Sequence, residues 1–167
     1  MNLEYKYHLV GNFDPGSRVW IYQASRLFSI GEALEIEELL EEFVRDWKSH
    51  GTPVKGSAHL FFGRFIVLIA DETATGVSGC STDSSVRLIK TIEAKYQNPL
   101  FDRTLLAFVV KDRIEMLPLN QLKYAWDNQF ITEDTLYFNN LVDTKKSLED
   151  GWIIPVKESW LMQRVSA

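Results

Sequence analysis

Residues 64–71 read Arg64-Phe65-Ile66-Val67-Leu68-Ile69-Ala70-Asp71, and this stretch decides the fold. An unbroken apolar run between an arginine and an aspartate is typical of a strand that is buried on both faces. Gly63 and the strand-like residues 54–62 come directly before it, which predicts a tight hairpin. The run is far too short to cross a bilayer, so we expect no membrane span.

Two helices and two further strands surround this hairpin. Ser29 and Glu32 have the spacing of a capping box. Apolar residues then recur at helical spacing until His50-Gly51 and Pro53, namely Ile36, Leu39, Leu40, Phe43 and Trp47. The expected elements are, in chain order, strand 19–23, the helix after Ser29, strands 54–62 and 64–71, a helix at 86–96 and a strand at 105–110.

This βαββαβ order resembles a ferredoxin-like sandwich, in which the first and third strands are central and both helices cover one face of the sheet. The opposite face would then expose Trp20, Tyr22 and Phe61, so we expect the remaining third of the chain to cover it. The predicted fold class is α+β, with a ferredoxin-like core at residues 1–111 and a C-terminal segment at residues 112–167 packed on it as one unit.

The C-terminal segment has its own pattern of a helix, the stretch 131–136, and a closing strand with Trp152 and Pro155. This arrangement resembles the small GYF-like modules of bacteria, some relatives of which bind proline-rich peptides. Leu117-Pro118-Leu119 stands where those modules have a Gly-Pro-aromatic entry. The peptide-binding activity is therefore not transferred to this chain.

Composition and charge restrict the classes of partner. A chain of 167 residues that is 46% hydrophobic can bury a substantial core. The net charge of -5 disfavours nucleic acid and anionic membranes, because both attract excess Lys and Arg. A single cysteine forms no intrachain disulfide, and residues 1–6 lack the pattern of a secretory signal. We expect a cytoplasmic protein.

The strongest candidate site is the small-residue stretch from Gly76 to Ser85, which precedes the second expected helix. Glycines permit unusual backbone geometry, and the free amides at a helix start attract anions. The residues that we expect to bind a small anion are Arg18, Gly76, Gly79, Ser81, Thr82 and Asp83. The same hydroxyls and carboxylate are also ordinary helix caps, so capping alone is the alternative interpretation.

Cys80 in this stretch is the candidate nucleophile, because the positive end of a helix favours a thiolate. His50 is the histidine that the expected sheet brings to the same rim, and it is the candidate base. The alternatives are a buried structural thiol at Cys80 and a solvated residue at His50. The histidines and Cys80 show no metal-ligand spacing, so we expect neither a metal nor another cofactor.

Three motifs resemble a family of short uncharacterised bacterial proteins that are often labelled ABC transporter ATPase. These motifs are residues 17–23, residues 78–86 and the stretch Phe138-Asn139-Asn140-Leu141-Val142. A nucleotide-binding P-loop needs G-x-x-x-x-G-K-[ST], and the nearest stretch, residues 51–57, has no lysine after its second glycine. The sequence therefore argues against an ATPase.

The sequence favours a binding or protein-interaction module whose partner is a small anion or another protein. Two other functions stay open: a cysteine-dependent enzyme or redox sensor that uses Cys80, and a protein that binds single-stranded nucleic acid through Trp20, Tyr22 and Phe61 on the sheet face. The acidic face of the first helix is interpreted as solvated surface; it comprises Glu32, Glu35, Glu37, Glu38, Glu41 and Glu42.

Overall fold

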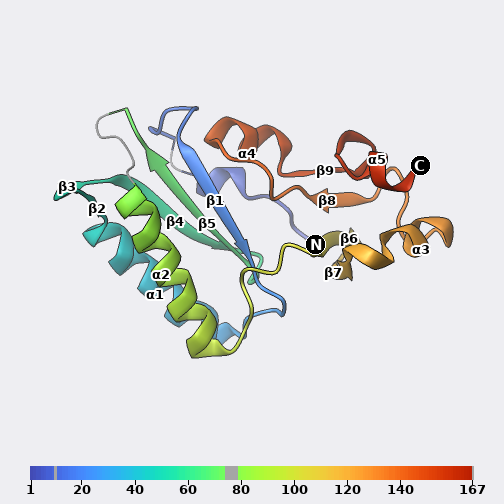
Figure 1. Ribbon diagram of the computed structural model, residues 1–167, viewed down its shortest axis with the longest axis horizontal. Helices are drawn as coiled ribbons and strands as arrows, with labels where there is room; N and C mark the ends of the chain where they lie inside the picture. The colour runs from blue at the N-terminus through green and yellow to red at the C-terminus, as the bar shows by residue number, and fades with distance from the viewer. Residues whose placement is uncertain (10, 74–78, 167) are drawn as a thin grey trace. The chain divides into compact units, whose positions relative to one another are not determined.

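The computed structural model describes residues 1–9, 11–73 and 79–166 (Figure 1). The chain divides into two compact units. The larger unit contains Leu3–Phe101 and Asp143–Glu149, and the smaller unit contains Met1–Asn2, Asp102–Val142 and Asp150–Ala167. The chain therefore returns to the larger unit for a short segment before it ends in the smaller one.

The larger unit is built around an antiparallel sheet with the strand order β1-β5-β4. The central strand β5 is buried along its whole length, as its apolar sequence predicts. The elements of this unit are η1 (Lys6–His8), β1 (Arg18–Gln23), α1 (Ile30–Asp46), β2 (Lys48–Ser49), β3 (Thr52–Pro53), β4 (Lys55–Phe61), β5 (Phe65–Asp71), α2 (Gly79–Tyr96) and most of α4 (Lys145–Gly151).

The strand expected to complete this sheet forms at the expected residues but pairs elsewhere. β6 (Leu105–Val110) pairs with β7 (Arg113–Pro118) across the turn Lys111-Asp112, where both residues have positive φ. Such a two-residue turn brings the next strand alongside immediately, so β6 gains a local partner. The expected boundary at residue 111 falls within this turn, and β1 remains an edge strand of its own sheet.

Helices α1 and α2 lie side by side on one face of this sheet (Figure 1). Their buried residues Ile36, Leu40, Ile89 and Ile92 pack with Ile66 and Leu68 of β5. Burying each such side chain contributes about 1.5–3 kcal/mol, which gives the layer its main stabilisation. The two helices are therefore held together by the same strand.

Helix α1 begins as predicted and ends slightly earlier. The Ser29 side chain accepts a hydrogen bond from the amide of Glu32, and the Glu32 carboxylate accepts one from the amide of Ser29. Trp47 is already extended, and a small hairpin of β2 and β3 follows with His50 and Gly51 at its tip. The positive φ of both tip residues suits this kind of turn.

The face assignment of three aromatic residues needs correction. Trp20 and Tyr22 lie opposite Leu68 and Ile66 in the register, so they are on the same face as the helices. Phe61 lies on the other face, where the Tyr5 ring meets it edge-on at 6.0 Å. Trp20 and Tyr22 therefore pack beneath the helix layer and do not form an open stacking surface with Phe61.

The second sheet face is covered by the N-terminal segment and by residues 143–149. The Tyr5 hydroxyl donates a hydrogen bond to the carbonyl of Leu148 at 2.5 Å, which links the two covering segments. The amide of Lys145 donates to the carbonyl of Ser17, and the amide of Val19 donates to the carbonyl of Asp143. A cover from the C-terminal third was expected, whereas the role of the N-terminal segment was not.

The smaller unit has an open antiparallel sheet with the order β7-β6-β8-β9. Its core includes Phe108, Tyr137 and Leu161, and the Trp160 indole donates a hydrogen bond to the Tyr137 hydroxyl at 3.1 Å. The remaining elements of this unit are η2 (Leu119–Gln121), α3 (Leu122–Asp127), β8 (Leu136–Phe138), β9 (Ile153–Pro155), η3 (Val156–Glu158) and α5 (Met162–Val165).

Among the described residues of both units, no helix combines the length and apolar character needed to cross a bilayer.

Candidate functional site

The predicted loop is in large part the first two turns of α2. The helix begins at Gly79, so Thr82 and Asp83 are helical, and the buried Ser85 hydroxyl donates a hydrogen bond to the carbonyl of Thr82 at 2.6 Å. Sequence periodicity missed these turns because their residues are small and polar. Gly76 and the side chains of Cys80 and Ser81 lie outside the described residues.

Arg18 and His50 lie in different settings. Arg18 begins β1, its guanidinium lies over Trp20 at 4.9 Å, and its Nε is 3.6 Å from a carboxylate oxygen of Glu72. An anion at Arg18 would therefore compete with this carboxylate. His50 is exposed at the tip of the β2–β3 hairpin, and its pairing with Cys80 stays a prediction.

A buried carboxylate that the sequence analysis missed lies at the end of β5. Asp71 accepts hydrogen bonds from the Thr73 amide and hydroxyl at 2.9 and 2.7 Å, and from the Asp14 amide at 3.1 Å. Lys55 Nζ is 3.3 Å away. The hydrogen bonds from Thr73, followed by those from Asp14 and Lys55, hold the pKa of Asp71 well below its usual range. Asp71 therefore anchors the strand end and the N-terminal segment.

A short motif that occurs twice in the sequence could have predicted the hydrogen bonds of Asp71. Asp71-Glu72-Thr73 and Asp102-Arg103-Thr104 share the pattern Asp-x-Thr, and Thr104 donates to Asp102 with its amide and hydroxyl in the same way. An aspartate that binds the backbone two residues later forms an Asx turn. These contacts of Asp71 tie the end of β5 to its own turn, to β4 and to the N-terminal segment, so we interpret it as structural.

The structure adds a site of another kind, a groove between α1 and α2 with a volume of about 530 Å³. We call it the helix groove. Apolar side chains of both helices form its floor, and charged or hydroxyl side chains form its rims. It is lined by Leu39, Glu42, Phe43, Asp46, Trp47, Lys48, Ser84, Arg87, Leu88 and Thr91.

The aromatic part of the floor is fixed from below. The Phe43 and Trp47 rings lie 4.9 Å apart, and Trp20 packs on Trp47 with a centroid distance of 6.0 Å. Trp47 also lies directly over Gly56, where an added Cβ would be 2.5 Å from the ring. Because β4 has a glycine at this point, the indole can approach the sheet closely.

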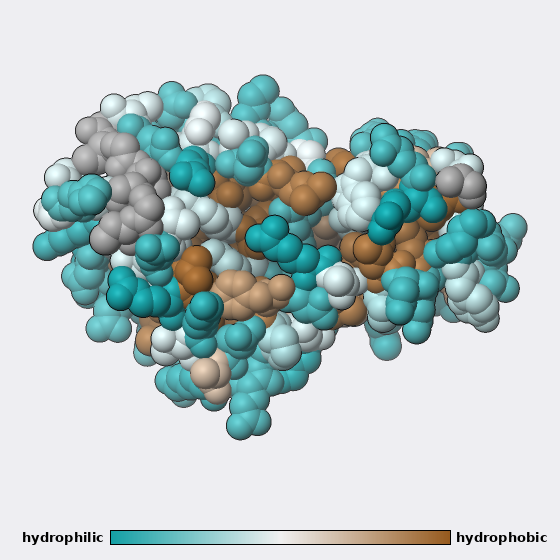
Figure 2. Space-filling view, in the orientation of Figure 1, coloured by the Kyte–Doolittle hydropathy of each residue, from teal (hydrophilic) through white to brown (hydrophobic). Residues whose placement is uncertain are grey.

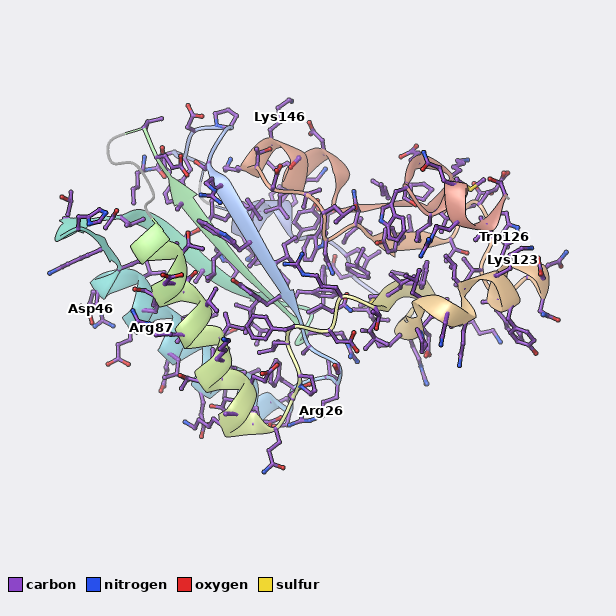
Figure 3. The ribbon with its side chains drawn as sticks, viewed as in Figure 1. Arg26, Asp46, Arg87, Lys123, Trp126 and Lys146 are labelled. Carbon is purple, nitrogen blue, oxygen red and sulfur yellow. The ribbon has the colours of Figure 1, made fainter. Side chains whose placement is uncertain are left out.

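The two rims carry opposite charges. Glu42 and Asp46 come from α1, whereas Arg87 comes from α2 and Lys48 from β2, which contacts α2. Figure 3 shows Asp46 and Arg87 on the same side of the larger unit, on neighbouring helices. Figure 2 shows that hydrophilic side chains cover much of the visible surface of this unit, with apolar patches between them.

Three of the rim charges, Glu42, Asp46 and Arg87, form no ion pair with one another among the described residues. Arg87 donates to the Ser84 hydroxyl at 3.2 Å, within its own helix. In the part of the chain that the structure describes, none of the ion pairs involves Glu42, Asp46 or Arg87. These exposed groups are therefore available to a ligand that crosses the groove.

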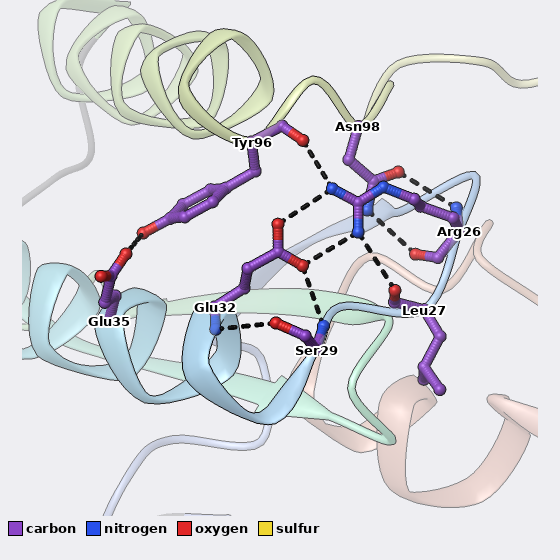
Figure 4. Close-up of polar contacts among 7 residues, drawn as sticks. All are labelled: Arg26, Leu27, Ser29, Glu32, Glu35, Tyr96 and Asn98. Carbon is purple, nitrogen blue, oxygen red and sulfur yellow. Dashed lines mark hydrogen bonds and ion pairs between the residues drawn. The ribbon is translucent and has the colours of Figure 1, made fainter.

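At the other end of the same two helices, polar contacts close the layer (Figure 4). The Arg26 guanidinium donates to both carboxylate oxygens of Glu32 at 2.9 Å and to the Tyr96 carbonyl at 2.6 Å. Asn98 accepts a hydrogen bond from the Arg26 amide and donates one to its carbonyl. We call these residues the Arg26 cluster; it comprises Arg26, Leu27, Ser29, Glu32, Glu35, Tyr96 and Asn98.

The Arg26 cluster changes the acidity of two of its members. The hydrogen bonds from Arg26 and then from Ser29 lower the pKa of Glu32 to about 2. Burial, followed by the hydrogen bond that Tyr96 donates to Glu35 at 2.6 Å, raises the pKa of the Tyr96 phenol to about 12. Both groups thus keep one charge state over the physiological range, as expected of a structural contact.

Comparison with known proteins gives no match: no family model, no curated protein and no solved structure matches this chain. The candidate site therefore depends on the geometry of the helix groove.

Proposed function

We propose that this protein is a binding module whose site is the helix groove, and that the ligand is a short segment of a partner protein in the cytoplasm. The observation that carries this proposal is the combination of a fixed aromatic floor with three rim charges, Glu42, Asp46 and Arg87, that form no ion pair with one another among the described residues. Binding sites commonly pair an apolar floor with a few polar groups that orient the ligand.

The size and composition of the groove suit one or two apolar side chains of a partner. A volume of about 530 Å³ lies within the range of about 300–1,000 Å³ found for ligand pockets. Seating one leucine or phenylalanine side chain on Phe43 and Leu88 would contribute about 1.5–3 kcal/mol. This energy alone gives weak binding, so the charged rims must contribute selectivity.

A selection from a library of random peptides displayed on phage tests the proposal with the full chain as bait. Thr91→Trp places a large ring at the exposed rim of the groove, whereas Ala94→Trp places the same ring one helical turn away, outside the groove. We expect selected peptides to lose at least most of their binding to Thr91→Trp and to keep it on Ala94→Trp. Selected peptides that bind both variants equally would show that the groove is not the site.

The anion site expected around α2 remains a separate proposal, supported by the start of an eighteen-residue helix at Gly79. Phosphate or sulfate should raise the melting temperature at concentrations where chloride does not, and Arg18→Ala should reduce that shift. Equal shifts with all three anions would leave only a general salt effect.

For the architecture we propose a ferredoxin-like arrangement that lacks its fourth strand in the larger unit, and a GYF-like arrangement in the smaller unit. The order β1-β5-β4 with both helices on one face supports the former. Helix α3 followed by strands β8 and β9, which extend the sheet beside β6, supports the latter.

A further inference from the structure

We propose that the partner segment of the helix groove is bipolar: it carries an apolar stripe with basic side chains on one flank, which face α1, and acidic side chains on the other, which face α2. This inference rests on the proposed function, and it adds the chemical class of the ligand. The carboxylates of Glu42 and Asp46 belong to one rim, and the Arg87 guanidinium belongs to the other.

The first argument is the separation of the charges by element. Glu42 and Asp46 are four residues apart on α1, so they point to the same side of that helix. Arg87 and Thr91 are likewise four residues apart on α2, and both line the groove. A ligand that lies between the helices therefore meets acids along one flank, and a base beside hydroxyls along the other.

The second argument is that charged groups bind one another at the Arg26 cluster, at the other end of this helix pair, but not at the groove. In the Arg26 cluster, Arg26 and Glu32 form a bidentate pair. In the groove, the described ion pairs leave Glu42, Asp46 and Arg87 unused.

The geometry points to an amphipathic helix as the form of the segment. A helix in a groove places its apolar stripe on the floor and its flanking residues on the two rims, which matches the floor of Leu39, Phe43 and Leu88 and the two charged rims. Charge complementarity then selects the partner, because the apolar floor alone does not distinguish one amphipathic helix from another.

Three defined peptides test this inference on the full chain. Each is a blocked peptide of roughly 14 residues with the same leucine stripe, since shorter helices are marginal in water. One has Lys on one flank and Glu on the other, one has Lys on both flanks, and one has Glu on both. Dissociation constants are measured by NMR titration of the amides of α1 and α2, and Thr91→Trp identifies binding in the groove.

We expect the Lys/Glu peptide to bind the natural protein about 3-fold to 10-fold more tightly than the other two, as two exposed charge pairs allow. The net charge of -5 would by itself favour the Lys/Lys peptide, so the expected ranking is not a general charge effect. Arg87→Glu should move the preference to the Lys/Lys peptide, and Glu42→Lys should move it to the Glu/Glu peptide.

Lys90→Glu is the matched control, because Lys90 is exposed on α2 outside the groove and the variant changes the net charge by the same amount as Arg87→Glu. Equal binding of the three peptides, or equal effects of the Arg87 and Lys90 variants, would overturn the bipolar ligand and leave the proposed groove intact, provided that Thr91→Trp still abolishes binding. Binding of none of the peptides, or binding that Thr91→Trp leaves unchanged, would overturn both.

Discussion

The two ends of the α1 and α2 helix pair treat charge in opposite ways. At the Arg26 cluster, a guanidinium, carboxylates and a buried amide bind one another across elements that are far apart in sequence. At the helix groove, Glu42 and Asp46 face Arg87 without an ion pair between them in the described structure. The comparison teaches that the same helix pair has a closed end that fixes its spacing and an open end that can accept a ligand.

The largest expected effect comes from breaking the closed end. Asn98 is fully buried and binds both the amide and the carbonyl of Arg26. Asn98→Ala leaves both groups without this partner, so we expect a loss of about 2–3 kcal/mol in unfolding free energy. Hydrogen exchange of β5 amides measures this for the larger unit. A loss no larger than that of Asn128→Ala, an exposed asparagine of the smaller unit, would contradict the structural role of Asn98.

The floor of the open end can be disturbed without touching a charge. Gly56→Ala brings a methyl group to 2.5 Å from the Trp47 ring, so the ring must move. We expect a destabilisation of about 1–2 kcal/mol and altered shifts for Phe43 and Leu88 in NMR spectra. Gly31→Ala is the control, since nothing lies within 4 Å of its added Cβ in α1. That variant should stabilise the helix by about 0.5–1 kcal/mol. Equal effects of the two variants would show that Trp47 does not need the space at Gly56.

The stability that the Arg26 cluster contributes should depend on pH, because Glu32 must stay ionised to pair with Arg26. The pKa of Glu32 is about 2 in the folded protein, below its ordinary value of 4.5. A lowered pKa gives stability that is present above the ordinary value and is lost as the pH falls through the folded one. We expect the natural protein to lose stability between pH 4.5 and 2, and Glu32→Gln to remove the part of that loss that comes from the cluster.

Asp71 and Asp102 contribute to the same acid response, because hydrogen bonds hold the pKa of each carboxyl below its ordinary value. Asp71→Asn therefore provides the comparison, because it should remove a different part of the loss. If Glu32→Gln left the whole pH dependence between 4.5 and 2 unchanged, the Arg26 cluster would not contribute to stability in the way its geometry indicates.

Local and periodic sequence patterns predicted several elements of the larger unit. The capping box at Ser29, the central strand β5 and the tight turn at Gly63 are all properties of neighbouring residues, and the structure confirms them. The α+β class follows from the same patterns. These patterns do not show whether β6 pairs with β1 or with β7. In the structure β6 pairs with β7, which follows it after the short turn at Lys111 and Asp112.

The candidate site was harder to predict because it depends on contacts between distant segments. Phe43 and Trp47 belong to the predicted apolar stripe, but only packing shows that Phe43 stays partly exposed beside Leu88 whereas Trp47 is buried. Glu42 was interpreted as part of a solvated acidic face, which is true of its exposure and says nothing of the cation across the groove. Asn98 and Arg26 lie too far apart in sequence for any pattern to join them.

The smallest expected effect on stability is that of Arg87→Ala, and its comparison with Arg26→Ala is the sharpest test of the difference between the two ends. Both remove one arginine from the α1 and α2 layer and change the net charge equally, so general electrostatics affects them alike. Arg87 donates one hydrogen bond to Ser84 of its own helix, and its removal should change the unfolding free energy by no more than about 0.5 kcal/mol. Arg26 binds the start of α1 and the end of α2, so its removal should lower the melting temperature clearly and speed exchange of the amides near both helix ends. The order should reverse for binding of the Lys/Glu peptide, which needs Arg87 and does not touch Arg26. Equal losses of stability in the two variants would mean that Arg26 and Arg87 contribute equally to folding. The distinction between a closed and an open end would then be wrong.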